Sequence, residues 1–411
     1  MMDLKLKQWL PLLISGVLLS AALLSNGLSR PARQTSATVD EATADEAPRV
    51  MEPMRGVWVT YMDLSMEYEE DKSEAAFRKK TEGIVELCAD RGFNTLIVQV
   101  RPFCDALYRS ELFPASHVLS GKQGKDPGYD ALDIICALCR EHRLSVQAWV
   151  NPYRVTADDV PEKLSESNPS VTDPELCLTT ESGTILDPSN EKARKLIADG
   201  VREIVEGYDV DGVQFDDYFY PPEIADEDRE QYKSYADNAE GKVMPLEEWR
   251  RQNVNLMLAQ VYMTVHEAKP DAVFGISPQG NLGNNAALYA DPASWCSVKG
   301  YADYICPQLY FSPDNPYLGF YDALDEWLAL DLAEGVRLYA GLAGYKAGSG
   351  DDEGTWLDRD DILAEEYRAV RDNEKLGGFM LYGYASLTDE KAADEIKKLT
   401  EEFDQASSPT Q

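Results

Sequence analysis

Histidine is scarce in this chain of 411 residues, which contains only His117, His142 and His266. None of them lies close in sequence to a cysteine or to the adjacent acids at 216 and 217. A zinc site built from histidine and cysteine is therefore poorly supported, and so is a serine nucleophile activated by histidine. With no metal motif and no cofactor motif, proton transfer falls to carboxylates.

Basic residues are also few, because 39 lysines and arginines stand against 73 acidic residues, for a net charge of −34. Long-range repulsion from such a charge opposes binding to nucleic acid or to an anionic membrane surface. We interpret the acidity as a property of a soluble surface. It carries no information about the fold.

The seven cysteines form no pattern that implies a disulfide framework, and their odd number leaves at least one unpaired. Cys136 and Cys139 are separated by two residues within a predicted helix, with no second such pair. Most of the seven lie in apolar stretches. We expect them to be small buried side chains.

Only one long hydrophobic run is present, from Trp9 to Leu24, and it follows Lys5 and Lys7. This run is shorter than a membrane-spanning helix, which needs about 20 apolar residues. Residues 1–30 are therefore predicted to be a signal peptide or an uncleaved membrane anchor. The protein is then exported, either secreted or anchored at the outer face of the cytoplasmic membrane or the cell wall. After residue 30 we predict a flexible linker over 31–52, one large domain over 53–404 and a disordered tail over 405–411.

Within the large domain, short β-branched or aromatic runs alternate with helical patterns. The predicted strands are 56–61, 94–101, 145–150, 212–216, 273–277, 304–309, 337–342 and 378–383. The predicted helices are 73–90, 129–142, 190–206, 246–267, a weak segment at 292–298, 319–331, 359–373 and 389–403. Eight strand–helix units in one direction predict an α/β fold, the parallel (β/α)₈ TIM barrel.

The loops agree with a barrel whose site lies on the C-terminal face of the strands. Turns from helix to strand are short, as at 90–93, whereas the segments 155–188 and 221–245 that leave strands are long and polar. An open, doubly wound sheet is the alternative. It is weakened because no glycine-rich phosphate loop follows the first strand.

The most informative segment is Asp211-Gly-Val-Gln-Phe-Asp216-Asp217, a predicted buried strand that ends at two acids. Side chains alternate along a strand, so Gln214 and Asp216 face the barrel interior, away from Val213 and Phe215. Two acids at a strand end suit acid/base catalysis on a glycosidic bond. The plain alternative is a loop cap or an ion pair with arginine.

Two further acids are candidates at other strand ends. Asp105 follows the second strand and Asp63 the first, with Asp105 the stronger of the two. An ion pair of Asp105 with Arg101 or Arg154, or a loop cap, is an equally good explanation for it.

The remaining strand ends are polar or aromatic together, a composition that fits stacking on sugar rings and hydrogen bonding to hydroxyls in a long groove. The predicted substrate-binding residues are Trp58, Gln99, Arg101, Trp149, Asn151, Tyr153, Arg154, Gln214, Tyr218, Tyr220, Ser277, Gln279, Gln308, Tyr310, Tyr345 and Tyr382. We therefore expect a polysaccharide partner.

Several motifs occur in an order that resembles one known family, the glycosyl-hydrolase-like family 10. They include Arg55-Gly-Val-Trp58, Gln99-Val-Arg-Pro102, Ala148-Trp-Val-Asn-Pro-Tyr-Arg154, Leu186-Asp-Pro188, Phe215-Asp-Asp-Tyr-Phe-Tyr-Pro221, Gly275-Ile-Ser-Pro278 and Asp303-Tyr-Ile-Cys-Pro-Gln308. The resemblance spans residues 55–387. It implies a (β/α)₈ glycosidase-like domain of exported bacterial proteins, some of which are linked to cutting peptidoglycan glycan strands.

The chain departs from that family at two positions. Gln214 stands where the family often has histidine, which argues against a mechanism that needs an imidazole beside the two acids. Cys104 stands where the family has glycine, and we expect a changed loop around Asp105 because cysteine disfavours positive φ.

Two mechanisms remain open for a glycosidase of amino-sugar polymers. Asp216 and Asp105 could act as a conventional pair across a cleft. Alternatively, by analogy with substrate-assisted N-acetylhexosaminidases, Asp216 orients a 2-acetamido group and Asp217 is the general acid. We favour the second. Two other classes stay open: a non-catalytic wall-binding protein, and a hydrolase in which Asp105, Asp216 and Asp217 hold a divalent ion.

Overall fold

A computed structural model describes residues 53–158, 160–221 and 224–407. The predicted signal or anchor over 1–30 and the predicted linker over 31–52 lie outside these residues. In the part of the chain that is described, no helix combines the length and apolar character that a membrane crossing needs. All seven cysteines carry free thiols, and all but the half-buried Cys177 are buried.

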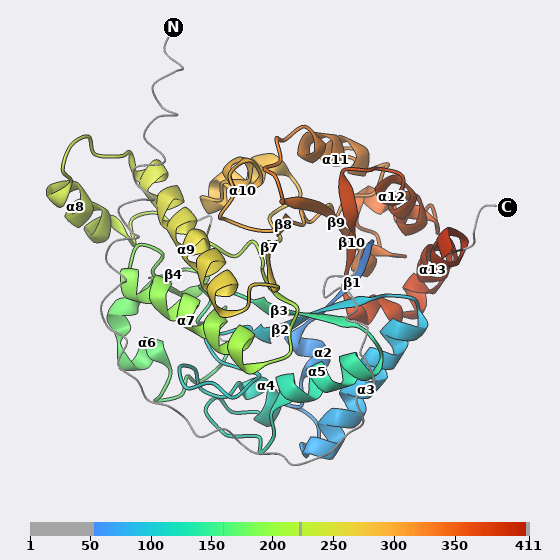
Figure 1. Ribbon diagram of the computed structural model, residues 1–411, viewed down its shortest axis with the longest axis horizontal. Coiled ribbons are helices and arrows are strands. Elements are labelled where there is room, and N and C mark those ends of the chain that lie inside the picture. Colours follow the sequence, from blue (N-terminus) through green and yellow to red (C-terminus); the bar gives the residue numbers. More distant parts are fainter. Residues whose placement is uncertain (1–52, 159, 222–223, 408–411) are drawn as a thin grey trace, which may run out of the picture. The chain divides into compact units, whose positions relative to one another are not determined.

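Eight parallel strands close into a barrel, and helices surround it (Figure 1). Each strand pairs with its neighbours in chain order, and β1 closes the ring with β10. The barrel strands are β1 Met54–Val59, β2 Thr95–Arg101, β3 Ser145–Val150, β6 Gly212–Phe215, β7 Val273–Ile276, β8 Tyr304–Ile305, β9 Arg337–Ala343 and β10 Leu376–Tyr382. The predicted (β/α)₈ barrel is confirmed.

The helices that cover the barrel fall close to the predicted segments. They are α3 Glu74–Asp90, α5 Ala131–Glu141, α7 Glu191–Gly207, α9 Leu246–Ala268, α10 Pro292–Ser297, α11 Phe320–Leu328, α12 Ile362–Arg371 and α13 Ala393–Ser407. Four of them, α3, α5, α7 and α10, begin at a residue whose side chain caps the first turn, as Ser73 does for α3 and Asn190 for α7. Because α13 runs to Ser407, the predicted disordered tail is wrong for residues 405–407.

The alternation of side chains along each strand builds two apolar regions. Outward-facing residues such as Val57, Val98 and Val213 pack in the large core under the helices. Inward-facing residues from strands around the ring pack inside the barrel: Met54, Trp58, Ile97, Trp149, Tyr304, Cys306, Tyr339 and Met380. The aromatic residues near the strand ends thus form the top layer of side chains inside the barrel, beneath the predicted site.

One predicted strand boundary is wrong, and two long segments contain elements that the sequence pattern did not predict. Strand β8 ends at Ile305 rather than at 309, because Pro307 has no N–H to donate to a neighbouring strand. The long segment after β3 contains the hairpin of β4 Cys177–Thr180 and β5 Gly183–Leu186, together with the short helix α6 Pro169–Thr172. The segment after β6 contains α8 Arg229–Asn238, which stands outside the ring of helices (Figure 1).

The first strand–helix connection and the next also contain short helices that the sequence pattern did not predict, α2 Tyr61–Leu64 and α4 His117–Ser120. Each covers a single turn, which is too short to leave a periodic signal. Both follow a strand, so they help to shape the C-terminal face.

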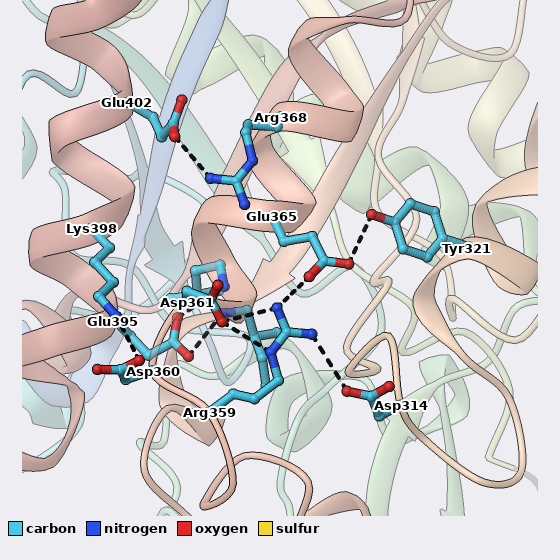
Figure 2. Close-up of polar contacts among 12 residues, drawn as sticks. Asp314, Tyr321, Arg359, Asp360, Asp361, Glu365, Arg368, Glu395, Lys398 and Glu402 are labelled. Atoms are coloured by element: carbon cyan, nitrogen blue, oxygen red, sulfur yellow. Dashed lines mark hydrogen bonds and ion pairs between the residues drawn. The ribbon is translucent and has the colours of Figure 1, made fainter.

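A polar network fixes the last helices to one another (Figure 2). Arg359 lies among the carboxylates of Asp314, Asp361 and Glu365, and the Tyr321 hydroxyl donates to Glu365 over 3.0 Å. The Glu395 carboxylate accepts hydrogen bonds from the first two amides of α12, Ile362 N at 3.0 Å and Leu363 N at 2.9 Å. A side chain of α13 therefore caps α12 and closes the ring next to β1.

Candidate active site

Asp216 directly follows strand β6 and faces the barrel axis, as the alternation of side chains along this strand predicts. Asp216 is 4% exposed. Its Oδ2 accepts hydrogen bonds from Trp149 Nε1 at 3.1 Å and from the Asn151 amide, and Gln99 Nε2 donates to Asn151 Oδ1 at 2.7 Å. Residues from β2 and from the end of β3 thus hold this acid on one side of β6.

Asp217 is held from the other side of β6. Gln279 Nε2 donates to its Oδ2 at 2.6 Å, and Gln308 Nε2 donates to its Oδ1 at 3.0 Å. The two glutamines follow β7 and β8 and pair with each other as an isolated bridge. We call Asp216 and Asp217 the Asp pair.

Burial and the neighbouring carboxylate of Asp217 hinder the ionisation of Asp216. Burial raises the pKa of Asp216 from its ordinary 3.8 to about 7, the positive charge of Arg154 lowers it, and the negative charge of Asp217 raises it further. A coupled pair of this kind holds one proton near neutral pH. A general acid needs such a proton, because it must donate one to the leaving group.

Aromatic rings line one side of the Asp pair. Trp149, the hydrogen-bond donor to Asp216, contacts Tyr382 edge to face, as does Trp58. Tyr382 stacks on Tyr310 with 5.7 Å between ring centroids, and Tyr345 meets both rings. We call these five residues the aromatic wall. It leads from the buried tryptophans outward to Tyr345, which is 49% exposed.

A cation lies on another side of the Asp pair. The Arg154 guanidinium is 4.3 Å from the ring centroid of Tyr218 and 5.6 Å from that of Phe103. Tyr218 is 57% exposed, and its backbone N–H donates to Asp216 Oδ1 at 3.3 Å. Arg154 and Tyr218 thus lie at the surface next to the Asp pair.

Gln214, predicted to bind substrate, lies instead inside the barrel beneath the site. It is fully buried, accepts from Trp58 Nε1 at 2.5 Å, and donates to the Tyr304 hydroxyl at 2.9 Å. Gly275 makes room for Tyr304, because an added Cβ would lie 1.9 Å from that ring. Both ends of the Gln214 amide are engaged, so the prediction that it contacts substrate is wrong.

The structure also contradicts a catalytic role for Asp105. Its side chain is fully buried, and its Oδ2 lies 3.3 Å from His117 Nδ1 and 3.1 Å from Gln123 Nε2. The suggested ion pair with Arg101 or Arg154 is not made either. Asp105 cannot reach a substrate while its loop keeps this conformation, so the pairing of Asp216 with Asp105 loses its support.

Cys104 adopts the conformation that we expected cysteine to avoid. Its φ is 52°, in the left-handed region. Its carbonyl accepts from Asn168 Nδ2 at 3.2 Å, and its side chain is 2% exposed. Packing and this hydrogen bond outweigh the backbone cost of about 1–2 kcal/mol, so the loop keeps a glycine-like path.

The other predicted residues lie at different depths relative to the Asp pair. Gln99, Asn151 and Trp149 support Asp216 from below, as described above, and Gln279, Gln308, Arg154, Tyr218 and the aromatic wall surround the pair. Four predicted substrate contacts have buried side chains that form no hydrogen bond with the pair. They are Arg101 (1% exposed), Tyr153 (0%), Tyr220 (1%) and Ser277 (2%). Asp63 caps α2 with Thr60 rather than approaching the pair.

Sequence reasoning missed Phe103 and Tyr61. Phe103 contacts Arg154 and also Tyr61 at a centroid distance of 5.2 Å. Both residues follow strand ends, so the rule that selected the other residues should have included them. Among the described residues, no group of three or more histidine, cysteine, aspartate or glutamate side chains could hold a metal ion.

The barrel, the Asp pair and the aromatic wall define the class of protein as a (β/α)₈ barrel of the glycoside-hydrolase type. The structure is similar to the glycoside hydrolase domain of PgaB (BpsB) from Bordetella bronchiseptica, with a TM-score of 0.57, 12% identity and coverage of 84% of this chain and 98% of that one. At this identity the similarity concerns the fold alone.

The sequence comparison gives the family. Residues 53–358 match Glycosyl hydrolase-like 10, and the chain belongs to this family. It is 35% identical to the glycosyl hydrolase YngK of Bacillus subtilis over an alignment of 341 residues that covers 76% of this chain but only 64% of that protein. It is 32% identical to the glycosyl hydrolase DigH of Escherichia coli K12, covering 72% of this chain and 74% of that protein.

Proposed function

We propose that this protein is an exported glycosidase that cleaves cell-wall peptidoglycan glycan strands, or a related amino-sugar polysaccharide. The observation that carries the proposal is the Asp pair at the end of β6, with a pKa of about 7 at Asp216 and the aromatic wall beside it. Family membership supports the reaction type. Export rests on the apolar run from Trp9 to Leu24 that follows two lysines.

The proposed mechanism is substrate-assisted. A 2-acetamido group enters beside Trp149, its N–H donates to the ionised Asp216, and its oxygen attacks the anomeric carbon. The glycosidic C–O bond breaks as Asp217 protonates the leaving oxygen, which gives a cyclic oxazolinium intermediate. Water then opens this intermediate while Asp217 takes the proton back, so the anomeric configuration is retained.

The single proton of the pair fits this sequence of events. In the free protein the proton resides on Asp216, the acid with the raised pKa. A donor that binds Asp216 favours its ionised form. The proposed mechanism then places the proton on Asp217, which Gln279 and Gln308 hold next to Asp216.

Digestion of purified glycan strands, with and without stem peptides, tests the function. We expect new reducing ends and products of defined mass. If binding occurs and no bond is broken, the protein is a carbohydrate-binding protein instead. A leaving-group series separates the two acids: the Asp217→Asn variant should recover activity on aryl glycosides with good leaving groups, and the Asp216→Asn variant should not.

A further inference from the structure

Arg154 lies beside aromatic rings rather than in an ion pair with any of the residues that the structure describes. Its guanidinium lies over the rings of Tyr218 and Phe103. The two other cations at strand ends differ from it. Arg101 is buried, and Lys346 is paired with Asp352 at 2.7 Å.

The surroundings of Arg154 leave its N–H groups available. Aromatic rings cover faces of a guanidinium, while its donors point outward in the guanidinium plane. Arg154 is half-buried and Tyr218 is 57% exposed, so a ligand can approach the donors from solvent. A planar fork of N–H donors fits a carboxylate, which it binds with two parallel hydrogen bonds.

The position of Arg154 ties this contact to the Asp pair. Its charge lowers the pKa of Asp216, so it lies within electrostatic range of the pair without touching it. A group bound at Arg154 therefore lies close to the bond that the pair would cleave. The net charge of −34 repels acidic polymers at long range, so binding them requires a local cation.

We propose that Arg154 binds a carboxylate carried by the sugar substrate next to the cleaved bond, and that the site therefore prefers acidic over neutral amino-sugar polymers. This inference rests on the proposed glycosidase function. The carboxylate has two possible sources, the lactyl group of a muramic acid residue without a stem peptide, or a uronic acid. Arg154 is thus a specificity residue.

The experiment compares two substrates that differ only in charge: peptide-free glycan strands, and the same strands after their carboxyl groups are reduced to alcohols. For the wild type we expect kcat/KM on the acidic strands to be about tenfold to a hundredfold higher, the usual worth of a hydrogen-bonded ion pair. Arg154→Gln should bring the ratio close to one. Arg154→Lys, which keeps the charge without the fork, should give an intermediate ratio.

Each variant is judged by its own substrate ratio, so a change in the pKa of Asp216 affects both substrates and largely cancels. Arg202→Gln is the matched control, because Arg202 pairs with Glu206 and Glu267 on helices outside the barrel. It should keep the wild-type ratio. An alternating polymer of N-acetylglucosamine and glucuronic acid identifies the source, since preference for it over the peptide-free strands assigns the carboxylate to a uronic acid.

A wild-type ratio near one, or an unchanged ratio in Arg154→Gln, would overturn the proposal. If the wild type cleaves none of these polymers, the proposed glycosidase function fails separately. The dissociation constants of the same acidic and reduced strands then decide the role of Arg154. A preference for the acidic strands that Arg154→Gln removes supports it, and equal binding refutes it.

Discussion

Asp216→Asn should stabilise the protein at alkaline pH. The pKa of Asp216 rises from 3.8 to about 7, so the folded state prefers the protonated carboxyl group. The stability that this group contributes is fully present below its unfolded pKa of about 4 and is lost as the pH rises through about 7. The ionised form above pH 7 therefore costs about 4 kcal/mol, from about three units at about 1.4 kcal/mol each.

Asparagine has nearly the same shape and carries no charge, so it avoids this cost. Part of the gain is lost because its amide meets donors from Trp149 and Asn151. We expect about 2 kcal/mol of stabilisation at pH 8, which raises Tm by about 4 °C. At pH 4.5 the difference should fall below about 1 kcal/mol.

Thermal unfolding at pH 4.5, 6 and 8 measures this effect. The control is Asp322→Asn, which changes the net charge equally at an exposed position in the first turn of α11. If Asp216→Asn and Asp322→Asn shift Tm equally at every pH, Asp216 is not a strained buried acid, and the reasoning about the pair's proton is refuted.

Three further results are expected. In wild-type kcat/KM profiles, activity should fall about tenfold per pH unit above about pH 7, as the pair loses its proton; a flat profile to pH 9 would contradict this. Gln308→Leu removes a donor to Asp217 and should lower kcat about tenfold to a hundredfold, whereas an unchanged kcat would mean that the amide does not position Asp217. Glu395→Ala removes the cap of α12 and should lower the free energy of unfolding by about 1–2 kcal/mol in denaturant titrations, with kcat unchanged; a large loss of kcat would contradict a purely structural role.

The fold was predictable because every barrel strand carries a strong local pattern. The inward direction of Asp216 followed from alternation along β6, and the structure agrees. The early end of β8 was also readable in principle, because Pro307 lies inside the predicted strand. The hairpin in the segment after β3 was not, since its strands are four residues each and half-exposed.

The site was less predictable because residues at a strand end differ in depth. Gln214 in β6 and Gln308 after β8 are the same residue type on strands that β7 separates. Gln214 is held between Trp58 and Tyr304 inside the barrel, whereas Gln308 holds Asp217. Asp105 appeared to be a strand-end acid, but its loop turns it toward His117 and Gln123. Such choices depend on contacts between segments far apart in the chain, and periodicity does not encode them.

The central claim is that the Asp pair breaks glycosidic bonds. The most direct test incubates purified glycan strands with the wild type, Asp216→Asn and Asp217→Asn, and measures both new reducing ends and strand binding. We predict that the wild type releases reducing ends, while each variant releases almost none and still binds the strands. Full cleavage by both variants would contradict the claim.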